Sequence, residues 1–394
     1  MEAEPTPGAM GRDDAPLASG PLRPAPSALS PVLPTYEGPC LAGLAGALLD
    51  RRRHEPPAWI PEPVRAARQV VLLVLDGLGW DQFLARPQLT PTMATLTGGP
   101  ITSVVPTTTA TALTSITTGL TPAEHGVVGY RVHVGEGEVM NVLRWRTEAG
   151  DARTKVRPPV FQPTPAFAGR HVPAVTRAEF VSTGFTAAHL AGSPIRGWRM
   201  PSTLPVEVAR LLADGEPLVY AYYDGIDKVA HEWGLHAHYE AEVAAADHLV
   251  AEVLAVLPSG AALLVTSDHG QVDVGDKTIT LSPEIMGEVT LLSGEGRFRW
   301  LHARPGTVDR LAEQATAEYG HLAWVRTRQQ VLAEGWLGGM PVPEVEQRLG
   351  DVALVARAPV AFVDPADTGE VSLVSRHGSL TSAEMLVPLL ARQA

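Results

Sequence analysis

Two carboxylates of this sequence come shortly after short apolar runs. Asp76 follows Val70–Leu75 directly, and Asp268 lies two residues beyond Ala261–Thr266. A carboxylate at the end of a buried strand is well placed to hold a metal ion, although a turn aspartate is the commoner interpretation of such a residue on its own. Asp268 is followed by His269 and then by glycine. An adjacent carboxylate and imidazole can both reach one ion where the strand breaks at that glycine.

Asp227 and His231 are a second pair of a carboxylate and an imidazole. Their spacing of i and i+4 puts both side chains on one face of a helical turn, close enough to bind one ion. An ordinary surface pair is an equally good interpretation of this spacing alone. His377 is followed by glycine near the end of the chain and by itself would be incidental. Taken together, the aspartates and histidines are hard or borderline ligands of the kind that suit Zn²⁺.

A threonine-rich segment offers hydroxyl groups near the start of a predicted helix. Residues 106–112 read Pro-Thr-Thr-Thr-Ala-Thr-Ala and lead into a short helix expected over residues 113–119. Backbone N–H groups and the helix dipole favour an anion at such a position, and one of the hydroxyls could act as a nucleophile. Threonine is also an ordinary helix cap, so the segment alone does not decide between these roles.

The apolar runs and the patterns between them predict a sheet that brings these groups together. Three runs are short enough for buried strands, namely Gln69–Leu75, Leu218–Tyr223 and Ala261–Thr266. Helical patterns lie between them at Val206–Ala213 and Val243–Leu257. Strands that alternate with amphipathic helices indicate an α/β fold with a central, mostly parallel sheet and helices on both faces. Ligands bind outside the carboxyl ends of the strands in such sheets, which is where the aspartates lie.

Composition divides the chain into three parts. Residues 1–35 are rich in proline with scattered Gly, Ser and Ala, which predicts a flexible leader because this composition cannot form a packed core. Residues 36–280 and 371–394 are assigned to the core that holds the predicted sheet and the candidate ligands. Residues 281–370 have a different pattern of predicted elements. Their short strands and helices indicate a small α+β insert or cap.

The chain of 394 residues carries 31 Lys and Arg against 43 Asp and Glu, a formal net charge of −12. An acidic surface repels phosphate backbones, so a nucleic-acid polymer is disfavoured as a partner. The single cysteine, Cys40, excludes an internal disulfide and a cysteine-rich metal site, so any metal must be held by His, Asp and Glu. No secretory signal and no apolar run of the roughly 20 residues needed to span a bilayer is present. We therefore expect a soluble, cytoplasmic protein with no membrane partner.

The order of these groups resembles that of the alkaline phosphatase superfamily, and most closely its nucleotide pyrophosphatase/phosphodiesterase branch, from about residue 36 to the end. The resemblance implies two Zn²⁺ ions, with Mn²⁺ as the alternative. The implied ligands are Asp227, His231 and His377 for one ion, and Asp76, Asp268 and His269 for the other. Thr109 matches the family's threonine nucleophile in the segment Pro-Thr-x-Thr, with Thr107, Thr108 and Thr111 as rivals.

Two departures from the family's pattern bear on substrate recognition. Its characterised nucleotide pyrophosphatases have Phe-Pro-Asn after the nucleophile, where this chain has Ala110-Thr111-Ala112. They also have an asparagine that donates to a phosphate oxygen, where this chain has Tyr130. Tyr130 or Asn141 is the expected substitute for that substrate contact.

The resemblance implies a two-zinc phosphodiesterase or nucleotide pyrophosphatase that acts through a covalent phospho- or nucleotidyl-threonine. Two cations about 4 Å apart can clamp the attacking and leaving oxygens of an in-line displacement. The expected partner is a small-molecule phosphodiester or nucleotide, and no oligomeric state is predicted.

Three alternatives stay open at the level of the sequence. A phosphomonoesterase is one, because Arg131, Arg144 and Arg146 follow the nucleophile helix and could clamp an extra negative charge. A phosphonate hydrolase of the same superfamily is another. The alternative of a different class is a non-catalytic, metal-dependent protein that binds a phosphorylated ligand.

Overall fold

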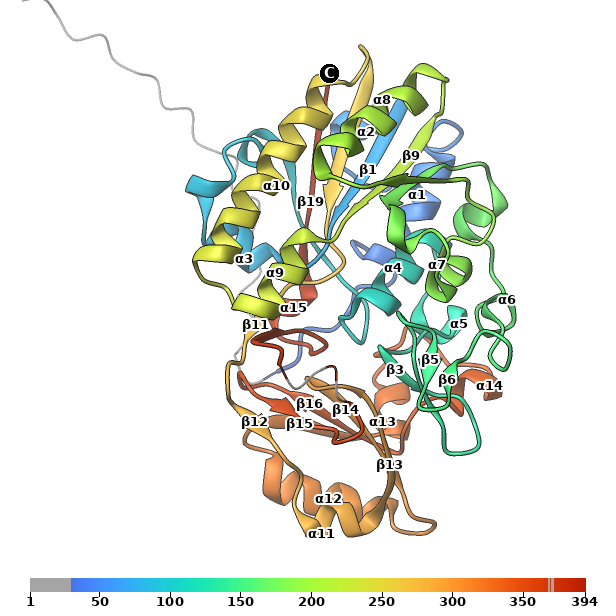
Figure 1. Ribbon diagram of the computed structural model, residues 1–394, viewed down its shortest axis with the longest axis vertical. Helices are drawn as coiled ribbons and strands as arrows, with labels where there is room; N and C mark the ends of the chain where they lie inside the picture. Colours follow the sequence, from blue (N-terminus) through green and yellow to red (C-terminus); the bar gives the residue numbers. More distant parts are fainter. Residues whose placement is uncertain (1–29, 368, 370–371) are drawn as a thin grey trace, which may run out of the picture. The chain divides into compact units, whose positions relative to one another are not determined.

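A seven-stranded β-sheet is the largest sheet of this computed structural model, which describes residues 30–367, 369 and 372–394 (Figure 1). In spatial order, its strands are β2 (Thr97–Thr102), β19 (Leu386–Gln393), β10 (Ala261–Thr266), β1 (Gln69–Leu75), β9 (Leu218–Tyr223), β7 (Ala174–Arg177) and β8 (Ile195–Trp198). The three predicted runs are β1, β9 and β10, and β1 pairs in parallel with both of the others. Only β19 runs against its neighbours. The predicted α/β fold with a mostly parallel sheet is therefore confirmed.

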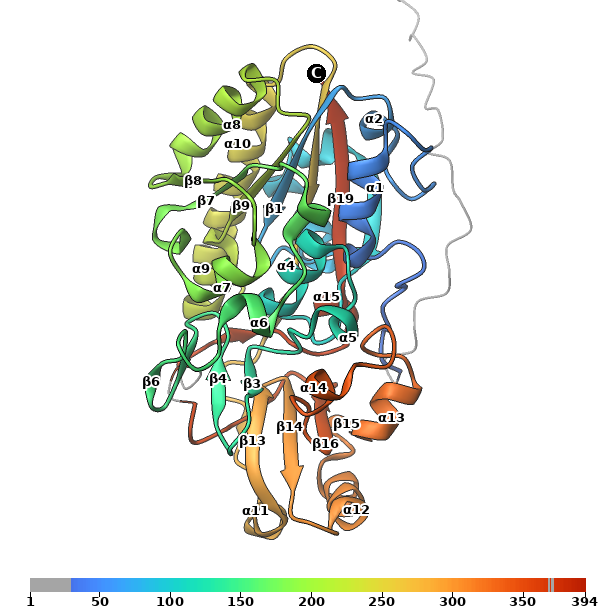
Figure 2. The same ribbon diagram turned by 90° about the vertical axis from the view of Figure 1, so that its right-hand side faces the viewer.

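Helices cover both faces of this sheet, because successive side chains of a strand point to opposite sides. From Val70 to Leu75, the even-numbered side chains join the hydrophobic cluster that includes α1 (Leu44–Asp50) and α4 (Thr109–Thr118). The odd-numbered side chains join the cluster that includes α8 (Leu204–Ala213) and α10 (Ala237–Ala255). Figures 1 and 2 show α8 and α10 on one face and α1 and α4 on the other.

The helices between the strands follow the predicted patterns closely. α8 ends at Ala213, as expected, whereas α10 begins at Ala237, before the expected periodic segment, and ends at Ala255, short of the expected Leu257. Between β9 and α10 lies α9 (Gly225–Trp233), which carries the Asp227 and His231 pair. The i, i+4 spacing therefore lies on a helix, as expected.

A second, antiparallel sheet of four strands lies between β10 and β19 in the sequence. Its spatial order is β13 (Val289–Glu295), β14 (Phe298–Ala303), β16 (Val352–Ala356) and β15 (Ala323–Thr327). It has its own hydrophobic core with α11 (Pro283–Glu288) and α12 (Val308–Tyr319), and α13 (Arg328–Ala333) follows β15 directly. Figure 2 shows this sheet and its helices below the ends of the main strands.

Small sheets connect these two parts. Strands β11 (Val272–Asp273) and β18 (Ser375–Arg376) form one pair, and β12 (Thr278–Ile279) and β17 (Ala361–Phe362) form another. A third small sheet contains β3 (Arg131–His133), β4 (Val139–Asn141), β5 (Arg146–Thr147) and β6 (Gly150–Asp151). The remaining α-helices are short: α2 (Glu62–Arg65), α3 (Trp80–Leu84), α5 (Pro122–His125), α6 (Pro158–Phe161), α7 (Gly184–His189), α14 (Pro343–Glu346) and α15 (Ser382–Met385).

Most of the leader predicted for residues 1–35 lies outside the described residues. In its last part, the Val32 N–H donates to the Leu380 carbonyl, and the Thr35 N–H donates to the Thr102 hydroxyl at 3.0 Å. Backbone contacts with the folded chain thus begin a few residues before the predicted boundary. Among the described residues, no helix combines the length and the apolar composition needed to cross a bilayer.

Candidate active site

The ends of β1, β9 and β10 bring three loops together. Asp76 follows β1, and its carbonyl accepts a hydrogen bond from the Asp227 N–H at 3.1 Å, near the start of α9. The Gly77 N–H donates to Asp268 Oδ1 at 3.1 Å. Gly77 has a φ of +79°, and a Cβ there would lie 2.9 Å from the Asp227 Cβ. A glycine after Asp76 is therefore what allows these loops to approach.

Asp76, Asp268 and His269 form a buried donor group. The Nε2 atom of His269 lies 3.4 Å from Asp76 Oδ1 and 3.5 Å from Asp268 Oδ2. All three residues are at most 2% exposed. Asp76 Oδ1 and Asp268 Oδ2 have no hydrogen-bond partner within the described part of the chain. Since buried polar atoms are normally paired, a cation is the partner that these oxygens fit.

Asp227, His231 and His377 form a second, partly exposed donor group. Asp227 Oδ1 lies 3.3 Å from His231 Nε2 and 3.7 Å from His377 Nε2. One ligand atom from each of the three residues falls within 4.8 Å of the others, a spacing that can hold one metal ion. His377 arrives here because β18 pairs with β11 and because Gly378 forms a bridge with Thr107.

Asp227 lies between the two groups. Its carboxylate also falls within 4.8 Å of ligand atoms of Asp76 and His269. The resemblance assigns Asp227 to one ion only, with Asp268 as the third ligand of the other. In this structure the six residues form one continuous cluster, and Asp227 has a carboxylate oxygen close to both donor groups.

The three histidines use their two ring nitrogens in the same way. The Nδ1 atoms donate to backbone carbonyls: His231 to Ser375 at 2.7 Å, His269 to Gly270 at 3.0 Å, and His377 to Thr107 at 2.8 Å. Because a carbonyl only accepts, each Nδ1 must carry the proton, and each Nε2 then presents a lone pair. This is the arrangement of metal-ligating histidines, whose second nitrogen is held by an outer partner.

The electrostatics of the cluster also favour a cation. Burial raises the pKa of Asp76 well above its usual value, and the nearby charges of Asp268 and Asp227 raise it further. Burial likewise raises the pKa of Asp268. Burial, together with the neighbouring imidazoles, lowers the pKa of His377 and keeps it neutral. A bound cation would reverse these shifts for the carboxylates.

Two residues that hold the ligands were not identifiable from the sequence pattern. The Tyr222 hydroxyl donates to Asp76 Oδ2, and Gln271 Nε2 donates to Asp227 Oδ1 at 2.5 Å. Ser375 in turn donates to Gln271 Oε1 at 2.9 Å. Tyr222 lies in a predicted strand whose pattern says nothing of its hydroxyl. Gln271 could have been suspected only from its position directly after Asp-His-Gly.

Thr109 is the first residue of α4, with Thr108 as the preceding cap position. Its hydroxyl lies 3.1 Å from His269 Nε2, beside the buried donor group. The rival Thr107 is committed elsewhere, since its hydroxyl donates to the Ser379 carbonyl and accepts from the Gly378 N–H. The Thr111 hydroxyl is buried and has no partner among the described residues.

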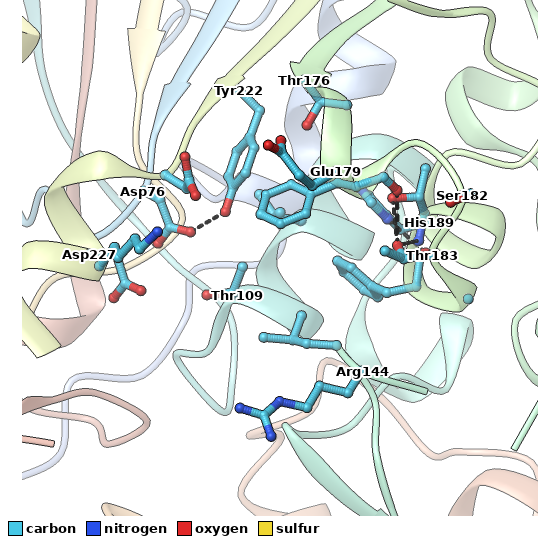
Figure 3. Close-up of a pocket in the computed structure, with 18 of the residues that line it drawn as sticks. Asp76, Thr109, Arg144, Thr176, Glu179, Ser182, Thr183, His189, Tyr222 and Asp227 are labelled. Atoms are coloured by element: carbon cyan, nitrogen blue, oxygen red, sulfur yellow. Dashed lines mark hydrogen bonds between the residues drawn. The ribbon is translucent and has the colours of Figure 1, made fainter. Parts of the chain in front are cut away.

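Two cavities meet at Thr109. The larger, of about 1180 Å³, has apolar and aromatic lining from Leu113, Phe180 and Phe185. Figure 3 shows Asp76, Asp227 and Thr109 on one side of it, and the segment with Glu179, Ser182, Thr183 and His189 across from them. The smaller, of about 250 Å³, reaches toward the second sheet and is lined by residues including Thr108, Tyr130, Glu295, Arg376 and His377.

The substrate contacts expected of Tyr130 and Asn141 differ in their placement. Tyr130 lines the smaller cavity. Asn141 is not among the lining residues of either cavity. Its side chain donates to the Tyr130 hydroxyl at 2.6 Å and accepts from the Arg144 N–H at 3.0 Å. Asn141 therefore holds two lining residues rather than facing the cavities itself.

Comparison with known proteins gives a family and a set of folds. The type I phosphodiesterase / nucleotide pyrophosphatase family matches residues 70–380. None of the curated proteins compared matches the sequence.

Among solved structures, murine ectonucleotide pyrophosphatase/phosphodiesterase 5 is similar with a TM-score of 0.61 and 16% identity, covering 82% of this chain and 88% of that chain. An inactive Thr-to-Ala variant of the murine protein in complex with AMP matches with a TM-score of 0.60, at the same identity and coverage. Phosphonoacetate hydrolase from Sinorhizobium meliloti, in complex with phosphonoformate, has a TM-score of 0.60 and 18% identity, covering 83% of this chain and 90% of that chain. At these identities the likenesses show the fold alone.

Proposed function

The chain belongs to the type I phosphodiesterase / nucleotide pyrophosphatase family, and on that premise we propose that it is a two-zinc phosphodiesterase or nucleotide pyrophosphatase acting through a covalent threonine ester on Thr109. Membership makes it a metal-dependent hydrolase of phosphoric ester or anhydride bonds, as the sequence predicts. The finer points, namely the zinc ions, the covalent route and the class of substrate, are proposals.

The observation that carries the proposal is the position of the Thr109 hydroxyl. It lies 3.1 Å from His269 Nε2, at the junction of the two cavities and beside a cluster of six N and O donors. A hydroxyl at the start of a helix also faces backbone N–H groups that favour an anion. Attack, anion binding and metal binding therefore converge on one point.

The donor set fits two Zn²⁺ ions, since zinc takes nitrogen and oxygen ligands and keeps open positions in catalytic sites. Asp227, His231 and His377 would hold one ion, and Asp76, Asp268 and His269 the other, with Asp227 near both. Mn²⁺ is the alternative ion. When bound, the ions would supply positive charge that lowers the pKa of a hydroxyl and offsets charge on phosphoryl oxygens.

The residues of the chain then perform a two-step displacement. The Thr109 hydroxyl loses its proton to solvent, its oxygen forms a bond to phosphorus, and the bond from phosphorus to the leaving oxygen breaks. Water next adds to the phosphothreonine ester, the bond to Thr109 breaks, and a proton returns to its oxygen. Tyr222 and Gln271 keep Asp76 and Asp227 oriented throughout. The inactive Thr-to-Ala variant of the murine relative supports an essential threonine.

The two cavities favour a diester over a monoester. A volume of about 1180 Å³ beside Thr109 exceeds the roughly 300–1,000 Å³ of typical ligand pockets, which suits a large organic group. Of the arginines that could clamp a monoester, Arg131 is already paired with Asp364. The fold shared with phosphonoacetate hydrolase keeps a phosphonate as the second candidate substrate.

The test is a side-by-side assay with added Zn²⁺ or Mn²⁺. The substrates are bis-p-nitrophenyl phosphate, p-nitrophenyl phosphate, the p-nitrophenyl ester of thymidine 5′-monophosphate, and phosphonoacetate. We expect the diesters to be cleaved fastest and the purified protein to carry close to two metal ions per chain by elemental analysis. Activity that survives complete chelation would disprove metal dependence, and a clear preference for p-nitrophenyl phosphate or phosphonoacetate would replace the diester proposal.

A further inference from the structure

Arg144 lines both cavities at the point where they meet near Thr109. Figure 3 shows its side chain extending from the hairpin toward the side on which Thr109 and Asp227 lie. The guanidinium group is therefore placed where a substrate bound at Thr109 would pass from one cavity into the other.

The backbone around Arg144 is anchored on both sides. Before it, Asn141 Oδ1 accepts the Arg144 N–H at 3.0 Å. After it, the Trp145 side chain is fully buried and donates from Nε1 to the Val156 carbonyl at 2.6 Å. Trp145 packs so closely on α7 that a Cβ at Gly184 would lie 2.4 Å from its Cγ. These contacts fix the turn between β4 and β5, and they therefore fix the position of the Arg144 backbone.

Other cationic side chains near Arg144 already have acidic neighbours. Arg131 is paired with Asp364, and Arg153 is paired with Asp151 at 2.5 Å. Arg146 lies opposite Asp151 in the pairing of β5 with β6. Arg144 makes no ion pair with any residue in the described ranges.

The acidic groups around the small cavity are also engaged. Glu295 Oε2 accepts the Tyr130 N–H at 3.1 Å, and Asp227 belongs to the metal-ligand cluster. Within the part of the chain that the structure describes, the charge of Arg144 is therefore left for a ligand.

We propose that Arg144 sets specificity by binding a second anionic group of the substrate, a phosphate or carboxylate attached next to the reacting phosphorus and held in the small cavity. The inference rests on the proposed function and deepens it. The small cavity, at about 250 Å³, is below the size that takes a drug-sized group but suits a small anion. The organic part of the substrate then occupies the large cavity, with the phosphorus at Thr109. Arginine suits this role because its planar fork donates two parallel hydrogen bonds to a carboxylate or phosphate.

The first test compares substrates that differ in the second anion. The p-nitrophenyl ester of thymidine 5′-monophosphate lacks it, ATP carries it as phosphate, and phosphonoacetate carries it as carboxylate. For Arg144→Gln, we expect the ratio of kcat/KM for ATP or phosphonoacetate to kcat/KM for the ester to fall at least about tenfold, equivalent to about 1.4 kcal/mol. The matched control is Arg146→Gln, which removes the same charge two residues away on the same hairpin and should leave the ratio within about threefold.

A fall in the ratio for ATP identifies the anion as phosphate, and a fall in the ratio for phosphonoacetate identifies it as carboxylate. An equal loss on all three substrates would overturn the proposal, because Arg144 would then contact the reacting phosphoryl group itself. A ratio unchanged in Arg144→Gln, or reduced equally in Arg146→Gln, would overturn it too.

A second test does not depend on catalysis. Calorimetry on the metal-loaded wild type and both variants measures dissociation constants for orthophosphate and inorganic pyrophosphate. We expect the preference for pyrophosphate over orthophosphate to fall at least about tenfold in Arg144→Gln only, and an unchanged preference would refute the role of Arg144. If the wild type cleaves none of the substrates, the proposed function fails, and this measurement still decides the role of Arg144.

Discussion

The two donor groups of the site differ in burial and in the part of the fold that builds them. Asp76, Asp268 and His269 come directly from the ends of β1 and β10 and are essentially inaccessible to solvent. In the other group, the side chains of Asp227 and His231 are 15% and 20% exposed and lie on α9. His377 completes this second group from the segment after β18.

This difference in burial indicates which donor group needs a bound cation more. Buried carboxylates without partners cannot be solvated, so their charge is costly unless a cation or a proton compensates for it. The partly exposed group can be solvated by water when its ion is absent. We therefore expect the buried group to bind its ion more tightly and the partly exposed group to exchange its ion more readily.

The largest expected effect concerns Thr109, which lies beside the buried group. Thr109→Ala should lower kcat by at least about 10³-fold, by analogy with other nucleophile knockouts, because the covalent route is lost. Metal content should not change, since the hydroxyl is not needed to hold the ions. The measurement is kcat with bis-p-nitrophenyl phosphate together with elemental analysis.

Thr109→Ser is the matched control and should keep measurable covalent turnover. Thr107→Ala should lower stability more than activity, because its hydroxyl bridges to residues 378 and 379. Near wild-type rates in Thr109→Ala, with Thr111→Ala inactive, would show that the nucleophile is Thr111.

Metal release separates the two groups directly. With a limiting chelator, we expect a fast phase from the partly exposed group and a slow phase from the buried one, followed with a colorimetric metal indicator. His377→Ala should remove the fast phase and lower both activity and metal occupancy, because it takes one of three ligands from that ion. A single phase in the wild type would show that the two groups bind alike.

The outer partners of the ligands should have unequal effects. Tyr222→Phe removes the hydrogen bond to buried Asp76 and should weaken metal binding about 10- to 100-fold. Gln271→Leu removes the matching bond to Asp227, where water can replace it, and should have a smaller effect. Competition with a chelator measures both affinities. A larger loss in Gln271→Leu would contradict the expected order of the two groups.

The smallest effect is on the stability of the metal-free protein. The pKa of Asp76 is raised on folding, so its protonated form contributes stability that is present below pH 3.8 and is lost as the pH rises through the raised value. His377, whose pKa is lowered, acts in the opposite direction and loses its contribution as the pH falls below 6.5. Each unit of pKa shift corresponds to about 1.4 kcal/mol.

Asp76→Asn should therefore raise the Tm of the metal-free protein near pH 7 and flatten the fall of its Tm as the pH rises above 3.8, as measured by thermal unfolding at a series of pH values. The same substitution should lower the Tm when zinc is present, because a ligand is lost. A Tm that rises with pH in the metal-free wild type, with no effect of Asp76→Asn, would refute this account of the buried group.

Much of the sheet could be predicted because its signals are local. β1, β9 and β10 are short apolar runs, and a carboxylate follows each of them within two residues. β2 escaped prediction because its residues, Thr97–Thr102, include two glycines and a proline and are half exposed. β19 joins the sheet antiparallel to β10. The direction of β19 depends on where the chain leaves the second sheet and not on the residues of β19.

The sequence by itself singled out the residues that we propose as metal ligands and nucleophile, because residue chemistry, strand ends and the i, i+4 spacing are local properties. Only the tertiary structure decided which of these side chains lie next to one another. It places the His377 imidazole against the Thr107 carbonyl, 270 residues away, and brings Asp227 between the two groups. It also adds Tyr222 and Gln271 as partners of the aspartates. These relations depend on the long-range pairing of strands and loops, for which a single sequence carries no periodic signal.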